Sequence, residues 1–323
     1  MNLITIPVKQ GDVLAATVWE RNDAKALVIL HPATAVSQAF YKDFAEYLYA
    51  MGFNVLTYDY RGIGHSRSGT LRHCHVSMSD WIEQDVGCVT AWAKLRFPNL
   101  LLMAVGHSVG GHAILLSTAT RSLHAAVLVA SHAGVTRTIQ QTQEKLRVWF
   151  LLRILAPVLC RTFGYMPARR LGLGEDLPAP VMLQWGRWSA MPDYFYDDRA
   201  WDARRRASEV TLPLLVLGFD DDPWANSAAI TRLLAPVENA KIERREIRHA
   251  DYGIPAVGHM GFFVPDVRKK YGLKSVAGWQ ASVNPRDNVF PAIFLIVEEI
   301  NRACYAVTVG AQVSKRQQAH PGK

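Results

Sequence analysis

None of the chain's few cysteines belongs to a C-x-x-C pair; they are Cys74, Cys88, Cys160 and Cys304. Such wide spacing is typical of reduced thiols and not of a disulfide framework. The N-terminus lacks a basic segment followed by a long apolar core, so we expect no signal peptide. The longest apolar stretch, residues 148–160, is interrupted by Arg153 and Pro157 and is too short to span a bilayer. These absences predict a cytoplasmic protein without stable membrane insertion.

A nucleic-acid-binding motif is also missing, although basic residues are in excess. Lys and Arg total 36 against 28 Asp and Glu, which gives a formal net charge of +8. The excess lies in residues 135–210 and 264–323, and the rest of the chain is nearly balanced. The one basic run, residues 204–206, is typical of a solvated face. We expect no nucleic-acid partner, and at most weak attraction to anionic surfaces or substrates.

Short apolar runs alternate with amphipathic stretches over most of the chain. A hairpin is predicted over residues 3–9 and 13–20. The continuous apolar runs at residues 26–30 and 125–130 are typical of parallel strands that are buried on both faces. The alternation predicts an α/β fold with a mostly parallel sheet and helices on both faces.

The strand–helix alternation stops between residues 135 and 209, where Trp, Arg and Pro are frequent. This stretch is longer than the usual connection between strands, so we interpret it as an inserted helical cap. The core is then formed by residues 1–134 and 210–263. For residues 264–323 we predict a C-terminal helix, near residues 290–305, and a disordered tail.

Residues 106–110 read G-x-S-x-G, with Ser108 at the centre. An apolar run precedes the motif and a helix-like run follows it, which is the context of a nucleophile elbow. Glycine suits both flanking positions because the turn is tight and strained. A glycine-rich turn with a solvated serine is the alternative interpretation. We predict that Ser108 is a catalytic nucleophile.

A serine nucleophile needs a base within hydrogen-bond reach, and the base needs an orienting carboxylate. His259, in a glycine-flanked loop after the last predicted strand, is the predicted base. Asp220, Asp221 and Asp222 all follow the strand predicted at residues 213–218. Counting from the end of that strand favours Asp221, whereas the following Pro-Trp-Ala favours Asp222, which we choose.

The order Ser, Asp, His and three separated motifs resemble the α/β-hydrolase superfamily over residues 3–263. Residues 184–188, 221–225 and 258–263 are similar to segments of predicted bacterial hydrolases of the serine aminopeptidase-like and esterase/lipase branches. The resemblance implies an α/β-hydrolase fold with eight strands. It also covers an Asp-x-Arg-Gly-x-Gly-x-Ser loop, in which we expect Asp59 and Arg61 to form a charge pair.

The resemblance further implies an oxyanion hole of two backbone N–H groups. The Val109 amide, directly after the nucleophile, is one predicted donor. The other should come from the loop after the strand at residues 26–30, where the superfamily usually has His-Gly. Here Pro32 takes the glycine position and has no N–H. Ala33 is therefore the predicted second donor, with Thr34 as the substitute.

Together these residues predict a serine hydrolase that cleaves an ester or related acyl bond of a small hydrophobic substrate through an acyl-enzyme. Neither a cofactor nor a metal is expected, and the substrate-binding residues are not identified by any motif. Two alternatives stay open at this point. One is a peptidase, thioesterase or acyltransferase on the same fold, and the other is a non-catalytic ligand-binding protein.

Overall fold

The computed structural model describes residues 1–8 and 11–264, so the helix and tail predicted beyond residue 264 lie outside the described residues. An eight-stranded sheet has the order β1-β2-β4-β3-β5-β6-β9-β10. The β1–β2 hairpin is antiparallel, β2 is antiparallel to β4, and all other neighbours are parallel. The predicted mostly parallel eight-stranded sheet is therefore confirmed. The strands are β1 (Asn2–Pro7), β2 (Val13–Trp19), β3 (Ala26–His31), β4 (Asn54–Tyr58), β5 (Leu101–His107), β6 (Ala125–Val129), β9 (Leu214–Phe219) and β10 (Ile242–Ile247).

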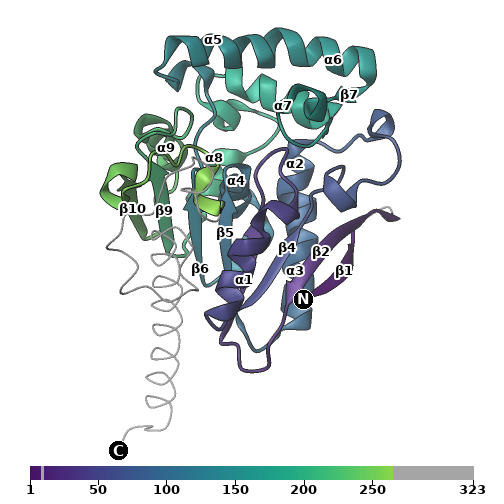
Figure 1. Cartoon of the computed structure of the whole chain (residues 1–323), viewed down its shortest axis with the longest axis vertical. Helices are drawn as coiled ribbons and strands as arrows, with labels where there is room; N and C mark the ends of the chain where they lie inside the picture. The colour runs from purple at the N-terminus through teal and green to yellow at the C-terminus, as the bar shows by residue number, and fades with distance from the viewer. Residues whose placement is uncertain (9–10, 265–323) are drawn as a thin grey trace, which may run out of the picture.

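Helices cover the sheet on both faces (Figure 1). Helix α1 lies in front of the sheet in this view and packs on β4 and β2, whereas α4 packs on β3, β5 and β6 from behind. The short helix α2 continues through a π-helical turn into α3, as one run over residues 78–96. The helices that cover the sheet are α1 (Lys42–Ala50), α2 (Met78–Asp80), α3 (Val86–Arg96), α4 (Val109–Leu116) and α9 (Ser227–Leu234).

The segment between β6 and β9 lies across the carboxyl end of the sheet, at the top of Figure 1. Its longest element is a helical run over residues 142–163, in which a π-helical turn at Leu151–Leu155 precedes Pro157. A π-turn suits this place because proline has no N–H for a regular helical bond. The other elements are β7 (Tyr165–Met166), β8 (Leu177–Pro178), α7 (Ala179–Ala190) and α8 (Ala203–Ser208), and the run itself comprises α5 (Thr142–Phe150) and α6 (Ala156–Phe163).

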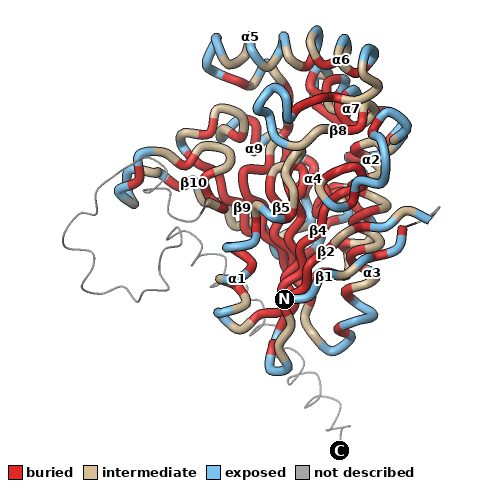
Figure 2. The backbone as a smooth tube through the Cα atoms, turned by 45° about the vertical axis from the view of Figure 1, so that its right-hand side comes forward, coloured by how far each residue is buried: buried red, intermediate tan, exposed pale blue. Residues whose placement is uncertain are grey.

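The buried core runs through the sheet and into this overlying segment (Figure 2). Every residue of β3, β4, β6 and β9 is buried, which explains the continuous apolar runs of residues 26–30, 125–129 and 214–219. Trp188 and Trp201 of the overlying segment are stacked with their ring centroids 5.2 Å apart, and both are buried. Within the described residues, no helix is both long enough and apolar enough to cross a membrane.

The parallel register gathers chemically useful residues at one edge of the sheet. His31 at the end of β3 is paired with Gly106, and His107 at the end of β5 is paired with Val129. Because the carboxyl ends of these strands are level, the loops after β3, β5, β6 and β9 converge. Ser108 and the three aspartates therefore lie at the same edge.

Candidate active site

Ser108 occupies a strained turn between β5 and α4. Its φ is 53° and its ψ is −112°, a conformation that a residue with a side chain rarely adopts. Its amide donates a hydrogen bond of 2.9 Å to the carbonyl of Val129 on β6. A Cβ at Gly106 would collide with the backbone of Gly110, and a Cβ at Gly110 would collide with the carbonyl of His31. The two motif glycines are thus required by the close approach of β5, α4 and β3.

Asp222 holds His259 by a buried hydrogen bond. His259 Nδ1 lies 2.7 Å from Asp222 Oδ2, and the Asp222 side chain is fully buried. The other carboxylate oxygen accepts the amides of Trp224 at 2.9 Å and Ala225 at 3.0 Å. Burial alone would raise the pKa of Asp222, but the His259 imidazole and these hydrogen bonds outweigh it and lower the pKa to about 2. Asp222 is therefore a carboxylate that orients His259 with Nδ1–H toward it.

The neighbouring aspartates have separate structural tasks. Asp221 accepts the amides of Val257 at 2.7 Å and Gly258 at 2.9 Å, so it shapes the turn before His259. Asp220 accepts from the amide and the Nδ1 of His249. Asp220, Asp221 and His249 are also the one group within the described residues whose ligand atoms lie close enough for a metal ion. Since their hydrogen bonds already account for the arrangement, we assign no metal to them.

A hydrogen-bonded chain connects the loop after β3 to the histidine loop. The Ala33 amide donates to Tyr41 Oη at 2.8 Å, and Tyr41 Oη lies 2.8 Å from His107 Nδ1. His107 Nε2 in turn lies 2.9 Å from the carbonyl of His259 and donates to it. The Ala33 amide thus has its hydrogen directed at Tyr41, contrary to the expectation that it faces an oxyanion. The Thr34 amide meets no acceptor among the described residues, and Thr34 lines the same cavity as Ser108.

Two histidines near Ser108, His107 and His112, are buried, and a third, His132, is half-buried. Burial lowers the pKa of His107 and of His112 to about 3, and that of His132 to about 4. The rings of His132 and His259 meet edge to face with centroids 5.4 Å apart. Because these three imidazoles are neutral, the ionised group that contacts His259 is the Asp222 carboxylate.

A cavity of about 390 Å³ joins Ser108 and His259. Most of its lining is apolar, and half of the lining residues, among them Leu151, Met182 and Trp185, come from the segment between β6 and β9. None of the described residues that line it is acidic. Of the two tryptophans of α7, Trp188 packs in the core, whereas Trp185 lines this cavity.

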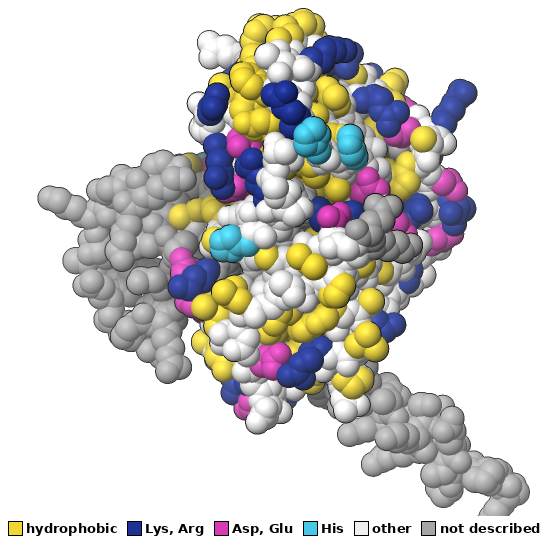
Figure 3. Space-filling model, turned by 90° about the vertical axis from the view of Figure 1, so that its right-hand side faces the viewer, with side chains coloured by type: hydrophobic (Ala, Val, Ile, Leu, Met, Phe, Trp, Pro, Cys, Tyr) yellow, Lys and Arg dark blue, Asp and Glu magenta, His cyan; other side chains and the backbone are white. Residues whose placement is uncertain are grey.

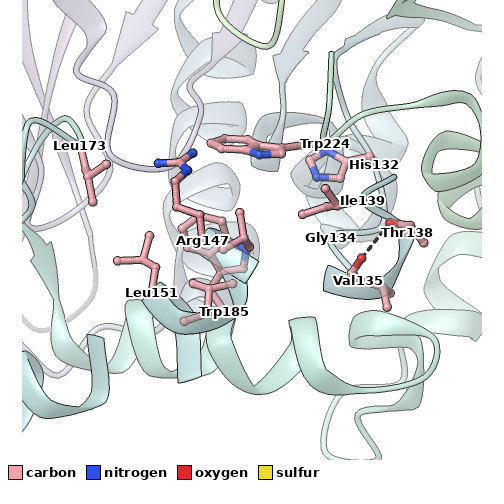
Figure 4. A pocket seen from close by; sticks show the side chains of 12 residues that line it. His132, Gly134, Val135, Thr138, Ile139, Arg147, Leu151, Leu173, Trp185 and Trp224 are labelled. Carbon is pink, nitrogen blue, oxygen red and sulfur yellow. Dashed lines mark hydrogen bonds between the residues drawn. The ribbon is translucent and has the colours of Figure 1, made fainter. Parts of the chain in front are cut away.

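A side chamber of about 70 Å³ adjoins the main cavity and shares Leu151, His132 and Trp224 with it. Figure 4 shows Trp224 beside His132, with Arg147 of α5 pointing toward Trp224. The Trp224 indole donates to Glu144 of α5 at 2.7 Å. Trp224 therefore connects the loop of Asp222 to the helix that roofs the chamber.

The Asp-x-Arg-Gly loop is held differently from the prediction. Asp59 accepts the amide of Gln38 at 2.6 Å and the amide of His65 at 3.0 Å. Arg61 instead forms an ion pair of 2.6 Å with Asp85, whose side chain is fully buried. The predicted Asp59–Arg61 pair is wrong because the carboxylate of Asp59 serves loop amides, while helix packing brings a different carboxylate to Arg61.

Sequence reasoning missed Tyr41, the structural task of His107, and His132. No motif marks Tyr41, which in the sequence resembles any other core aromatic residue. The one available signal for His132 was its place in the loop after the buried strand β6, at the edge where the other site residues converge.

Comparison with known proteins agrees with this architecture. Residues 22–169 match the family model described as serine aminopeptidase, S33. None of the curated proteins is similar to the chain in sequence. The structure of DcsB with its substrate analogue has a TM-score of 0.54 at 14% identity, covering 94% of this chain and 99% of that chain.

Two further proteins of known structure, one of them the esterase EaEST, share the fold. EaEST from Exiguobacterium antarcticum has a TM-score of 0.51 at 16% identity, covering 83% of this chain and 95% of that chain. Est1E from Butyrivibrio proteoclasticus, with bound ferulic acid, has a TM-score of 0.52 at 16% identity, covering 80% of this chain and 91% of that chain. The chain therefore has the fold of the α/β-hydrolase superfamily, and its residues 22–169 are similar to the serine aminopeptidases.

Proposed function

We propose that this protein is a serine hydrolase with Ser108, His259 and Asp222 as its triad. The observation that carries the proposal is the buried Asp222–His259 hydrogen bond at the rim of a cavity that also contains Ser108 on its strained turn. Because the Asp222 carboxylate keeps the proton on His259 Nδ1, the Nε2 atom is left bare and can accept a proton.

In the proposed reaction, Ser108 Oγ attacks the carbonyl carbon of the substrate while His259 Nε2 takes the hydroxyl proton. The charge that develops on the carbonyl oxygen is stabilised by backbone amides. We propose Val109, at the start of α4, and Thr34, whose amide has no described acceptor, as the donors. His259 then gives its proton to the leaving group, and water hydrolyses the acyl-enzyme by the same steps.

The lining of the cavity favours an apolar acyl group. An aminopeptidase needs an anionic group to hold the charged amino terminus of its substrate, and the described lining residues include no carboxylate. Leu151, Met182 and Trp185 instead offer apolar surface. We therefore propose a small hydrophobic ester as the substrate class, in keeping with the esterase EaEST, which shares the fold.

We further propose that residues 135–209 act as a cap over a core made of residues 1–134 and 210–263. The support is that this segment supplies Leu151, Met182 and Trp185 to the cavity wall, while the core supplies Ser108 and His259. On this proposal the cap selects the substrate, and the core performs the chemistry.

A fluorophosphonate probe tests the nucleophile without knowledge of the substrate. We expect a covalent adduct at Ser108, found by peptide mass spectrometry, that is absent in Ser108→Ala and strongly reduced in His259→Ala. A folded protein that remains unlabelled would overturn the proposed triad.

Paired substrates test the class of bond. We expect p-nitrophenyl esters of short acyl chains to be hydrolysed faster than aminoacyl p-nitroanilides. Faster hydrolysis of the anilides would favour the peptidase alternative. Labelling at Ser108 without turnover of either series would point to another acyl transfer.

A further inference from the structure

The outer face of the helical run over residues 142–163 exposes a stripe of large apolar side chains. Each of the five is between 44% and 60% exposed. Apart from one adjacent pair they are three or four residues apart, a spacing that places them on one side of the helix. They are Leu146, Trp149, Phe150, Ile154 and Val158. Figure 3 shows hydrophobic side chains gathered at the top of the molecule, where this run lies. A contiguous apolar patch of this kind usually marks a binding surface, unlike scattered single residues.

Basic residues outnumber acidic residues along this run, and its one acidic residue, Glu144, is already paired with Arg147. From residue 145 to residue 174 the sequence contains six Lys or Arg and no Asp or Glu. Arg153 and Arg161 are exposed on the same helical run, and neither forms an ion pair with any residue in the described part of the chain. The surface therefore combines apolar contact with uncompensated positive charge.

The charge decides between two occupants of this face. In a symmetric dimer the same patch would meet its own copy, which would bring Arg153 and Arg161 against like charges without an acidic partner. An anionic lipid surface supplies the missing negative charge. An exposed amphipathic helix with Trp and Phe on one side and Arg nearby is also the kind of helix that lies in the plane of a bilayer interface.

The inner face of the same helix adjoins the site. Val148, Leu151 and Leu152 line the side chamber, and Leu151 also lines the main cavity with Ser108. One helix thus separates the exposed stripe from the candidate active site. A molecule dissolved in the lipid would have only this helix to pass.

We propose that the outer face of the helical run 142–163 docks on an anionic membrane surface. Trp149, Phe150 and Ile154 enter the boundary between headgroups and acyl chains, while Arg153 and Arg161 contact lipid phosphates. The docking is peripheral and requires no membrane-spanning segment. It is independent of the proposed reaction, so it can be measured in a catalytically inactive chain.

Flotation of the full chain carrying Ser108→Ala with vesicles tests the proposal. We expect binding to vesicles of phosphatidylcholine with 30% phosphatidylglycerol, and at least tenfold weaker binding to phosphatidylcholine alone, because each basic residue near an anionic surface adds to the affinity. Equal binding to the two kinds of vesicle, or binding to neither, would overturn the proposal.

Two sets of variants locate the surface. Trp149→Gln with Phe150→Gln should weaken binding to anionic vesicles at least tenfold, and Arg153→Gln with Arg161→Gln should remove most of the preference for anionic lipid. The matched control is Leu95→Gln on α3, because Leu95 is 84% exposed and lies outside the stripe. Binding should be unchanged by this control.

Sedimentation equilibrium distinguishes the other occupant. A dimer of the full chain that Trp149→Gln dissociates, without vesicle binding, would assign the stripe to a second copy and contradict the membrane proposal. Circular dichroism and thermal melting of each variant confirm that any lost binding does not come from unfolding.

Discussion

Replacing Asp222 by asparagine alters the candidate active site by a single atom. The native carboxylate accepts from His259 Nδ1 with one oxygen and from the Trp224 and Ala225 amides with the other. An asparagine has one acceptor oxygen, and keeping both backbone bonds directs that oxygen at the amides. Its NH₂ group then faces His259 Nδ1, which must become the acceptor. The proton of the imidazole moves to Nε2, the atom that has to receive the proton of Ser108.

The structure sets the size of the expected effect. A base in the wrong tautomer costs about 10³- to 10⁴-fold in rate, or roughly 4–5 kcal/mol of activation free energy. The pKa of Asp222 is lowered to about 2 from 3.8, so the folded state also favours its carboxylate by roughly 2 kcal/mol. This stabilisation is present above pH 4 and is lost as the pH falls toward 2. We expect Asp222→Asn to reduce stability by a similar amount at pH 7.

The matched control is Asp221→Asn, which removes the same charge one residue away. Its side chain can keep one of the two bonds to the Val257 and Gly258 amides, so the loss should be about tenfold or less. The measurement is the second-order rate of fluorophosphonate labelling at Ser108, with urea unfolding to correct for stability. A larger loss in Asp221→Asn than in Asp222→Asn would refute the assignment of the acid.

Three further predictions follow from the packing around the site. Gly106→Ala should abolish soluble folded protein, because the added Cβ would collide with the α4 backbone. The control is Gly87→Ala in α3, where the added Cβ would meet no atom within 4 Å, so the change should be neutral or stabilise the fold by about 0.5–1 kcal/mol. Tyr41→Phe leaves the Ala33 amide and His107 Nδ1 without a hydrogen-bond partner, so it should lower the free energy of unfolding, measured with urea, by about 2–4 kcal/mol. Tyr49→Phe should lower it by less than about 1 kcal/mol, because the Tyr49 hydroxyl makes one hydrogen bond of 3.3 Å. The urea concentration at the unfolding midpoint should decrease as the pH is lowered from 7 to 5, because burial holds four histidine pKa values at about 3 to 4 in the folded chain. The unfolded chain therefore binds protons first, and the free energy of unfolding drops by up to about 1.4 kcal/mol per histidine per pH unit below 6.5. An unchanged midpoint would contradict these pKa values. The four are His31, His107, His112 and His132.

The fold was predictable because its strands carry their own signature. Residues 26–30 and 125–129 are buried on both faces of the sheet. The sequence of such a strand is an uninterrupted apolar run, whichever strands lie beside it. The turn at Ser108 was predictable for a similar reason. Gly106 meets an obstacle within the strand–turn–helix unit itself, so the local sequence contains that constraint, whereas the obstacle at Gly110 is the carbonyl of His31 on β3.

The overlying segment was predictable only in outline. The end of the strand–helix alternation indicated an insertion, but short apolar stretches around Trp185 and Trp188 gave no sign of which ring would be packed and which would face a cavity. That difference depends on the position of α7 over the sheet, and one helical turn separates the two outcomes.

Side-chain partners distant in sequence were decided by the tertiary structure alone. Asp220, Asp221 and Asp222 all follow the same strand, and the contact that distinguishes them comes from a loop that returns 37 residues after Asp222 and brings His259 to it. Arg61 likewise found its counter-ion on a helix and not in its own loop. The sequence by itself determined where the backbone makes strands, helices and the sharp turn at the serine, because those depend on contacts within a few residues. The tertiary structure decided which charged and polar groups meet, because that depends on where another segment ends in space.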